Sequence, residues 1–300
     1  MLSKAISQLQ HLPSRLRFLP SSRIFFIPTA AIRSPPNKIS ILRSIERAAP
    51  LSATMTRRLN QQVSDDDWRP EQPSKRDPTM ETSSNKADIL ERLLQADGFK
   101  TWGFVIYRCT YSSDLDWQKF LDLFLSHAKR TLEFYSGLDL LNDFAPTVLE
   151  DPSFENATVH EVREHFKTWA VDAVQREQHI TASRGSEFCP RTGRYRFFVM
   201  VDQEALESVL NAPDRRSLRR AFVRLVNAEW EPKTLDEEEL EALGGPLDEF
   251  EPLEGCTLED VGWMRVPFQE VGLNGFVAML DANSWDLFYS RPPTVQSLTG

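Results

Sequence analysis

Two histidines and two glutamates lie close together between residues 160 and 165, and such residue types can hold a metal ion. His160 and His165 flank Glu161 and Glu164. A metalloprotease helix needs histidines four residues apart, so that both face one metal ion. Here the histidines are five apart, which turns the two rings about 140° from each other on a helix. The spacing therefore predicts a solvated helix face and no metal site.

Paired carboxylates can supply a general acid and a general base where burial drives their pKa values apart. The pairs nearest the ends of expected strands are Asp114 with Asp116 and Glu150 with Asp151. Helix capping and loop solvation are the commoner roles of such acids, and we expect those roles here. Cys109 could be a nucleophile only with a base beside it, so a small buried apolar residue is the favoured interpretation.

Arginines gather between residues 191 and 224, in a chain that is acidic overall. Guanidinium groups bind phosphate and carboxylate, so the cluster could hold an anionic ligand. The candidate anion-binding residues are Arg194, Arg196, Arg219 and Arg220. The alternative, which the composition favours, is pairing within the chain with the acidic run at 234–262. That run holds eleven acids and no Lys or Arg, which is typical of a solvated, mobile insertion.

The sequence contains no Gly-rich dinucleotide loop, no P-loop, no nucleophile elbow and no kinase signature. Its three cysteines, Cys109, Cys189 and Cys256, are far apart, and no CxxC or Cys/His cluster is present. We therefore expect no cofactor, no metal site, no disulfide framework and a reducing compartment.

Charge divides the chain into a basic beginning and an acidic remainder. Residues 1–60 carry ten Lys or Arg and one acid, so their net charge is +9. Because the net charge of the whole chain is −9, the remaining residues carry a net charge of −18. An acidic domain repels phosphate backbones, which argues against a nucleic-acid partner. No run of about 18 apolar residues exists, so we expect no membrane span.

The Arg-rich, Ser-rich and acid-poor composition of residues 1–60 is typical of a mitochondrial presequence, so a mitochondrial address is expected. Two alternatives stay open. Translation could begin at Met55, which would make the extension non-native and the protein cytoplasmic. A secretory signal would need its apolar core at residues 18–32, which Pro20, Arg23 and Pro28 interrupt.

The elements that would position these groups alternate between strands and helices after residue 85. The stretch 101–110 is almost continuously apolar, which suits a central strand buried on both faces. Helices are expected between 86 and Gly98, over 115–135 up to Gly137, from a Thr158–Glu161 capping box, and after Asp202. Further strands are expected at 146–149, 194–201 and 221–230.

This order of elements resembles an α+β, ferredoxin-like (split βαβ) sandwich with elaborations. Residues 86–300 are expected to form a single α+β domain, with the acidic insertion at 234–262. Residues 61–85 are polar and Pro-containing and are expected to be a disordered linker, after a disordered amino-terminal extension at 1–60.

Four stretches, Trp102–Arg108, Arg194–Asp202, Gly262–Val266 and Arg291–Pro293, together resemble a family of filamentous-fungal proteins of unknown function. The resemblance covers about residues 100–295. It brings with it no activity, ligand or catalytic residue.

Two hypotheses for function follow. The first is a non-enzymatic binding or interaction protein built on an α+β domain, with a protein or a small molecule as partner. The alternative is a small-molecule enzyme of the ferredoxin-like dimeric-barrel kind, with a pocket between sheet and helices. A concave apolar cavity with two or more converging polar groups would favour the enzyme. A filled core and an exposed sheet face would favour the binding protein. The sequence sets no oligomeric state.

Overall fold

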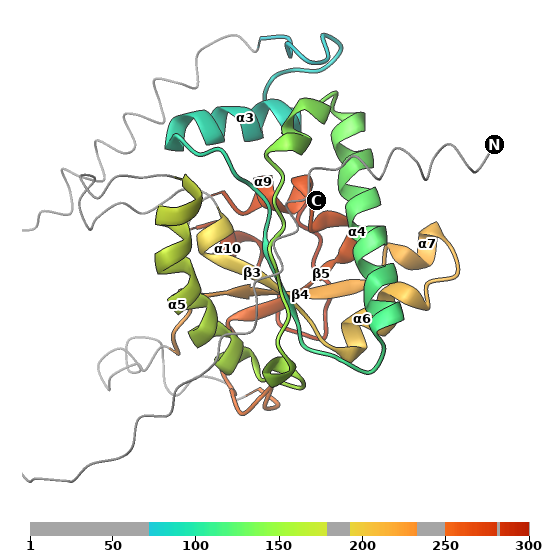
Figure 1. Ribbon diagram of the computed structural model, residues 1–300, viewed down its shortest axis with the longest axis vertical. Helices are drawn as coiled ribbons and strands as arrows, with labels where there is room; N and C mark the ends of the chain where they lie inside the picture. The colour runs from blue at the N-terminus through green and yellow to red at the C-terminus, as the bar shows by residue number, and fades with distance from the viewer. Residues whose placement is uncertain (1–71, 179–192, 233–249, 281–282, 300) are drawn as a thin grey trace, which may run out of the picture. The chain divides into compact units, whose positions relative to one another are not determined.

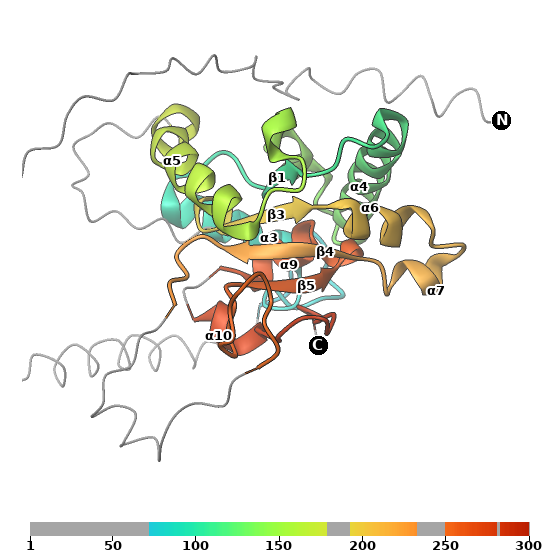
Figure 2. The same ribbon diagram turned by 90° about the horizontal axis from the view of Figure 1, so that it is seen from below.

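The computed structural model describes residues 72–178, 193–232, 250–280 and 283–299. Within these residues the chain forms a five-stranded sheet in the order β2-β1-β3-β4-β5 (Figures 1 and 2). β1 is parallel to β2 and to β3, whereas β4 is antiparallel to both of its neighbours, β3 and β5. The strands are β1 Val105–Arg108, β2 Val148–Leu149, β3 Phe197–Val201, β4 Phe222–Asn227 and β5 Trp263–Pro267.

Helices surround this sheet and connect its strands (Figure 1). The two longest are α4, Asp114–Phe134, and α5, Val159–Gln178. The shorter α-helices are α3 Lys86–Asp97, α6 Gln203–Leu210, α7 Arg215–Leu218, α9 Leu273–Ala278 and α10 Ser284–Phe288. Single 3-10 turns are η1 Leu138–Asn142, η2 Pro152–Phe154, η3 Gly193–Tyr195 and η4 Phe268–Glu270.

Both faces of the sheet are covered, as neighbouring residues of β3 show. Phe198 packs against Phe166 of α5, with ring centroids 4.7 Å apart. Phe197 points to the opposite face and stacks on Trp285 of α10 at 5.9 Å, and Figure 2 shows α5 and α10 on opposite sides of the strands. Successive side chains of a strand alternate between faces. Double covering therefore explains why every residue of β1 and β3 is buried.

The helix boundaries follow the predicted capping residues closely. The backbone N–H of Thr158 donates to Glu161 Oε2 at 2.8 Å, and the backbone N–H of Glu161 donates to Thr158 Oγ1 at 3.3 Å. These two hydrogen bonds confirm the predicted capping box at α5. Ser113 caps α4 and Asp202 caps α6. At the far end of α4 the boundary differs, because the left-handed residue is Ser136, with φ 52°, and Gly137 has a negative φ.

The mixed helix and strand content agrees with the α+β prediction, but the ferredoxin-like arrangement is not confirmed. In a split βαβ unit another strand separates the two parallel strands, whereas β1 and β3 here are direct neighbours. β1 also lies one place off centre, because β3 is the middle strand of the five. β5 was not predicted, although it pairs with β4 along its whole length. Strand order depends on long-range pairing, which local sequence patterns do not encode.

The carboxyl-terminal part of the acidic insertion contacts the folded unit, while residues 233–249 lie outside the described residues. Glu254, with a positive φ of 49°, accepts the backbone N–H of Val159 at 2.8 Å and pairs with Arg224 at 2.7 Å. This carboxylate therefore connects the first residue of α5 to β4. Among the described helices, none combines the length and the apolar character that crossing a bilayer requires.

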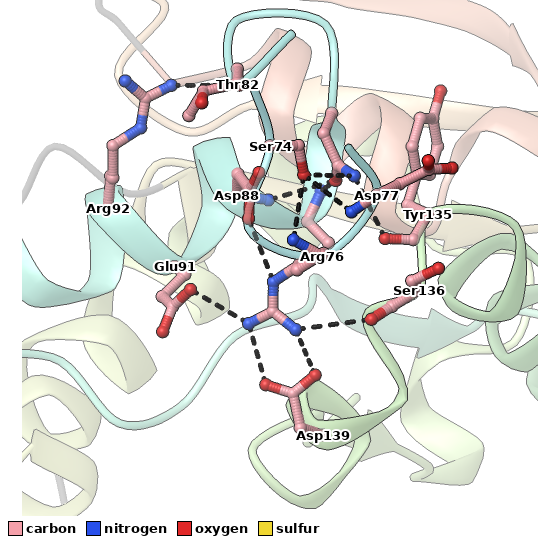
Figure 3. Close-up of polar contacts among 12 residues, drawn as sticks. Ser74, Arg76, Asp77, Thr82, Asp88, Glu91, Arg92, Tyr135, Ser136 and Asp139 are labelled. Atoms are coloured by element: carbon pink, nitrogen blue, oxygen red, sulfur yellow. Dashed lines mark hydrogen bonds and ion pairs between the residues drawn. The ribbon is translucent and has the colours of Figure 1, made fainter. Parts of the chain in front are cut away.

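The segment 73–85, which was expected to belong to a linker, packs against α3 and the turn after α4 (Figure 3). The Ser74 hydroxyl is buried and accepts hydrogen bonds from the backbone N–H groups of Arg76 and Asp77 and from the Asn85 side chain. Asn85 in turn caps α3 and donates to the Tyr135 carbonyl at 3.2 Å. Residues 61–71 of the expected linker lie outside the described residues.

Arg76 is the main polar anchor of this segment. Its guanidinium pairs with Asp88 and Glu91 of α3, at 3.2 and 3.0 Å, and with Asp139 of η1 (Figure 3). It also donates to the Ser136 carbonyl. The Arg76 side chain is only 11 % exposed. Hydrogen bonding to Asp139 is the largest cause of the raised pKa of Arg76.

Candidate functional site

The predicted acid pairs lie near the carboxyl ends of β1 and β2, where open α/β sheets commonly bind ligands. Arg108, at the end of β1, is buried and donates to Asp114 at 2.5 Å and to Glu150 at 3.4 Å. Glu150 also accepts the Trp117 indole N–H at 2.6 Å. The fold therefore brings together one residue of each predicted pair, and both carboxylates pair with the same arginine.

The other two acids of these pairs have lowered pKa values. A hydrogen bond from Lys119 is the first cause for Asp116, and the backbone N–H of Ser153 is the first cause for Asp151. A general acid near neutral pH needs a raised pKa, so neither group fits that role. Asp151 takes the predicted capping role, at η2, whereas Asp116 lies in the first turn of α4 and pairs with Lys119.

Cys109 is 1 % exposed, and burial raises the pKa of its thiol to about 12. A cysteine in this state remains a thiol at neutral pH and does not act as a nucleophile.

The two histidines of the apparent metal motif both lie on α5. Groups of three or more His, Cys, Asp or Glu with metal-binding geometry are absent from the described part of the chain. His165 Nδ1 lies 2.8 Å from the hydroxyl of Tyr107 on β1. Burial raises the Tyr107 pKa and lowers the His165 pKa, so a protonated phenol donates to a neutral imidazole.

Arg194, the first candidate anion-binding residue, is fully buried and already bound within the chain. Its Nε and Nη2 donate to the two oxygens of Glu177 at 2.7 and 2.8 Å. Nη1 donates to the carbonyls of Gly103 and Ala145, and Nη2 also donates to Thr147 Oγ1. An arginine has five N–H donors, so all of them are used and none is left for an added anion.

Arg196 and Arg224 also form pairs within the chain. Arg196 binds Glu229 at 3.0 Å, and its side chain is 6 % exposed. Arg224 binds Asp202 at 2.5 Å and Glu254 at 2.7 Å. The Arg224–Glu254 pair is an instance of the predicted pairing between the arginines and the acidic run.

Arg219 and Arg220 differ from these three arginines. They follow α7 and are exposed, as are Arg216 of α7 and Arg130 of α4. Among the residues that the structure describes, no ion pair includes any of these four. Among the described residues, the predicted arginine cluster therefore splits into Arg194, Arg196 and Arg224, which are paired within the chain, and the exposed arginines at α7, which form no ion pair.

Arg219 lines an open groove of about 660 Å³ between α4, α6 and α7. The positions of these three helices on one side of the molecule can be followed in Figures 1 and 2. Its apolar lining consists of Leu123, Phe134, Val209, Leu210, Ala212 and Leu218. Its polar lining consists of His127, Arg130, Thr131, Tyr135, Asp214, Arg219, Gln269 and Asn274. We refer to this feature as the α4–α7 groove.

One wall of the α4–α7 groove is a stripe along α4. Leu123, His127, Arg130 and Phe134 recur at three- and four-residue spacing, which places them on one helix face. The neighbouring, core-facing stripe holds the buried residues of the helix, including Phe120, Phe124 and Leu132. Phe134 is 65 % exposed and Leu123 38 % exposed, so this second apolar stripe is not covered by the core.

The floor of the groove holds polar groups in defined states. His127 Nε2 lies 2.5 Å from the Gln269 carbonyl, which only accepts, so Nε2 carries the proton. Burial, opposed by this hydrogen bond, lowers the His127 pKa, with the nearby Arg130 adding to the lowering. The ring is therefore neutral at pH 7, and the positive charge of the lining comes from Arg130 and Arg219.

Two further groups complete the lining. Asn274 lines the groove, but its Oδ1 is buried and has no hydrogen-bond partner among the described residues. Asp214 is the one acid of the lining, and its carboxylate caps α7 through the Ser217 N–H at 2.7 Å and hydroxyl at 2.9 Å. The lining thus offers two cations, one carboxylate that is engaged in capping, and exposed apolar side chains.

Sequence reasoning identified Arg219 but missed the rest of the groove. The available signal was the apolar residues of α4 outside its inward stripe, Leu123 and Phe134, with Arg130 between them. The opposite wall and floor come from α6, α7 and η4, which only the tertiary fold brings to this face.

Comparison of the chain with protein-family models, curated proteins and solved structures gives no match. The resemblance to a filamentous-fungal family therefore stays a prediction.

Proposed function

We propose that this chain is a non-enzymatic binding protein, and that it binds a partly apolar, anionic ligand in the α4–α7 groove. The observation that carries the proposal is one concave surface that combines the exposed side chains of Leu123 and Phe134 with Arg130 and Arg219. These two arginines form no ion pair with any residue that the structure describes. Exposed apolar groups rimmed by polar ones are typical of binding sites.

The ligand chemistry follows from the lining. A carboxylate, sulfonate or phosphate would pair with the guanidinium groups of Arg130 and Arg219, whose geometry suits such planar or forked acceptors. An apolar body would cover Phe134 and Leu123.

The enzyme hypothesis has weaker support. Polar groups do converge in a cavity, but the groove lies outside α4 and not between sheet and helices, where a barrel-type enzyme would hold its substrate. The titratable histidine of the groove, His127, is bound to a backbone carbonyl. Cys109 and the predicted acid pairs are not part of the lining.

A fluorescent anionic amphiphile, anilinonaphthalene sulfonate, tests the proposal on the full chain. We expect it to bind the wild type with enhanced emission, and Arg219→Glu to weaken binding by about tenfold. Arg92→Glu is the matched control, because Arg92 is an exposed arginine on α3 that does not line the groove. Equal binding to the wild type and to both variants would rule out the groove as an anion site.

A further inference from the structure

The exposed stripe of α4 has the length and spacing of a helix-binding surface. Leu123 and Phe134 are its two apolar ends, and their separation of eleven positions along the helix corresponds to about 16 Å. This length equals about three helical turns. An amphipathic helix in a groove makes contacts that repeat at three- and four-residue spacing, as these side chains do.

The wall of the groove opposite α4 also combines apolar side chains with positive charge. Leu210 and Leu218 give it apolar side chains, and Arg219 stands at its rim. Arg216 and Arg220 extend the positive charge along α7, outside the lining itself. The cations thus flank apolar side chains on both walls, which is the arrangement that a helix with one apolar and one acidic face would complement.

We propose that the occupant of the α4–α7 groove is an acidic amphipathic helix of a partner protein. This inference rests on the proposed function and narrows its ligand to a protein segment. The apolar face of the helix lies against Leu123, Phe134 and Leu218, and its acids pair with Arg130 and Arg219. Charge complementarity favours this partner, because these arginines make no ion pair within the described part of the chain, on a domain whose remaining charge is strongly negative.

A small anion is the competing occupant, and the shape of the groove argues against it. The groove is open, and its two exposed apolar residues lie at opposite ends of the α4 stripe. A ligand that reached only one end would leave the other in water. A helix of about three turns covers both ends at once, so it buries more of the apolar surface.

The test is a selection of randomised peptides of about 16 residues, displayed on their encoding nucleic acid, against the full chain. We expect enriched peptides to carry apolar residues at three- and four-residue spacing with acids on the other face. Their affinity, measured by fluorescence anisotropy, should fall about tenfold with Arg219→Glu and with Phe134→Ser. A shuffled peptide of the same composition should bind more weakly, because it loses the apolar face.

Two matched controls separate groove binding from general attraction. Arg92→Glu repeats the charge reversal on α3, and Leu287→Ser removes an exposed apolar side chain on α10 that is 78 % exposed. Neither should change peptide affinity. Because Phe134 and Arg219 are both exposed, circular dichroism should show that all four variants keep the wild-type fold.

The outcomes distinguish this inference from the proposed function. If anilinonaphthalene sulfonate binds in an Arg219-dependent way but no enriched peptide depends on Arg219 and Phe134, the ligand is a small anion and the helix inference is wrong. If shuffled peptides bind as well as the originals, charge alone acts and the inference is again wrong. If neither the dye nor any peptide depends on the groove, both proposals fail.

Discussion

Arg76 and Asp139 join two parts of the chain that are 63 residues apart in sequence. Nη1 and Nη2 of Arg76 donate to the two carboxylate oxygens of Asp139, the second at 2.8 Å (Figure 3). The Arg76 hydrogen bond is also the largest cause of the lowered Asp139 pKa. A bidentate pair fixes orientation as well as distance. The segment before α3 is therefore held against η1 as part of the fold.

Replacing Arg76 should destabilise the protein. Arg76→Ala removes hydrogen bonds to Glu91 and Asp139 and an ion pair with Asp88 from a side chain that is 11 % exposed, so we expect a loss of about 1–3 kcal/mol in the free energy of unfolding. Urea denaturation measures this loss. Arg92→Ala is the control, because Arg92 makes one exposed bond to the Thr82 carbonyl, and its effect should stay within about 0.5 kcal/mol. Equal midpoints for the two variants would contradict the anchoring role.

The same contacts set the boundary of the folded unit. A chain that begins at residue 72 keeps Ser74 and Arg76, whereas one that begins at residue 86 loses them together with the Asn85 cap of α3. We expect both to unfold cooperatively, and the shorter chain to melt at a lower temperature. Differential scanning calorimetry compares them. If the shorter chain is as stable as the longer one, residues 72–85 add nothing to the fold.

The starts of the helices could be predicted from local sequence signals, whereas the order of the strands could not, because it depends on long-range pairing. Ser113, Asp202 and the Thr158–Glu161 box begin their helices where the sequence indicates, because a cap is satisfied within three residues. β5 carries no such signal. Its place is set by pairing with β4, from Phe222 opposite Pro267 to Val226 opposite Trp263, across the intervening insertion.

Introducing a charged side chain into β1 tests whether this strand is buried. Val105 of β1 is fully buried, so Val105→Asp places an unpaired carboxylate in the core and should cost on the order of several kcal/mol. Val171→Asp is the matched control, because Val171 on α5 is 69 % exposed. Thermal unfolding should show a large fall in melting temperature for the first variant and almost none for the second. A Val105→Asp protein that melts with the wild type would place this side chain in solvent.

The Tyr107–His165 contact predicts a pH dependence of stability. Burial, which the charge of Asp151 opposes, lowers the folded-state pKa of His165 below its ordinary value of 6.5. The unfolded chain then binds the proton more readily, so this contribution is present above pH 6.5 and is lost as pH falls through the folded pKa. The His127 pKa shifts in the same direction.

The unfolding free energy, measured in urea from pH 7.5 to pH 5, should therefore decrease as pH falls. His165→Gln keeps an acceptor for Tyr107 but does not titrate, so it should reduce the slope. His160→Gln on the same helix is the control and should leave the slope as in the wild type. The aspartates with lowered pKa values lose their contribution only at lower pH, below about 4. An unchanged slope in His165→Gln would contradict the assignment.

The candidate site was only partly visible in the sequence, because residue type does not report burial. Arg194 and Arg219 belong to one arginine-rich stretch, yet the first binds groups from four other positions and the second faces a groove. Phe134 reads as one more apolar residue of α4, and its exposure follows from the position of α6 and α7. Such distinctions come from tertiary packing, which a single sequence does not specify.

Replacing these two arginines should separate a structural role from a binding role. Arg194→Ala leaves the Glu177 carboxylate, which is 21 % exposed, without its partner and removes the donors to Gly103, Ala145 and Thr147. Breaking a buried pair on one side costs about 3–5 kcal/mol, so we expect a large fall in the denaturation midpoint. Arg219→Ala should leave the midpoint unchanged and weaken the binding of anilinonaphthalene sulfonate. The reverse pattern, with Arg194→Ala stable and deficient only in anion binding, would show that Arg194 is the ligand-binding arginine.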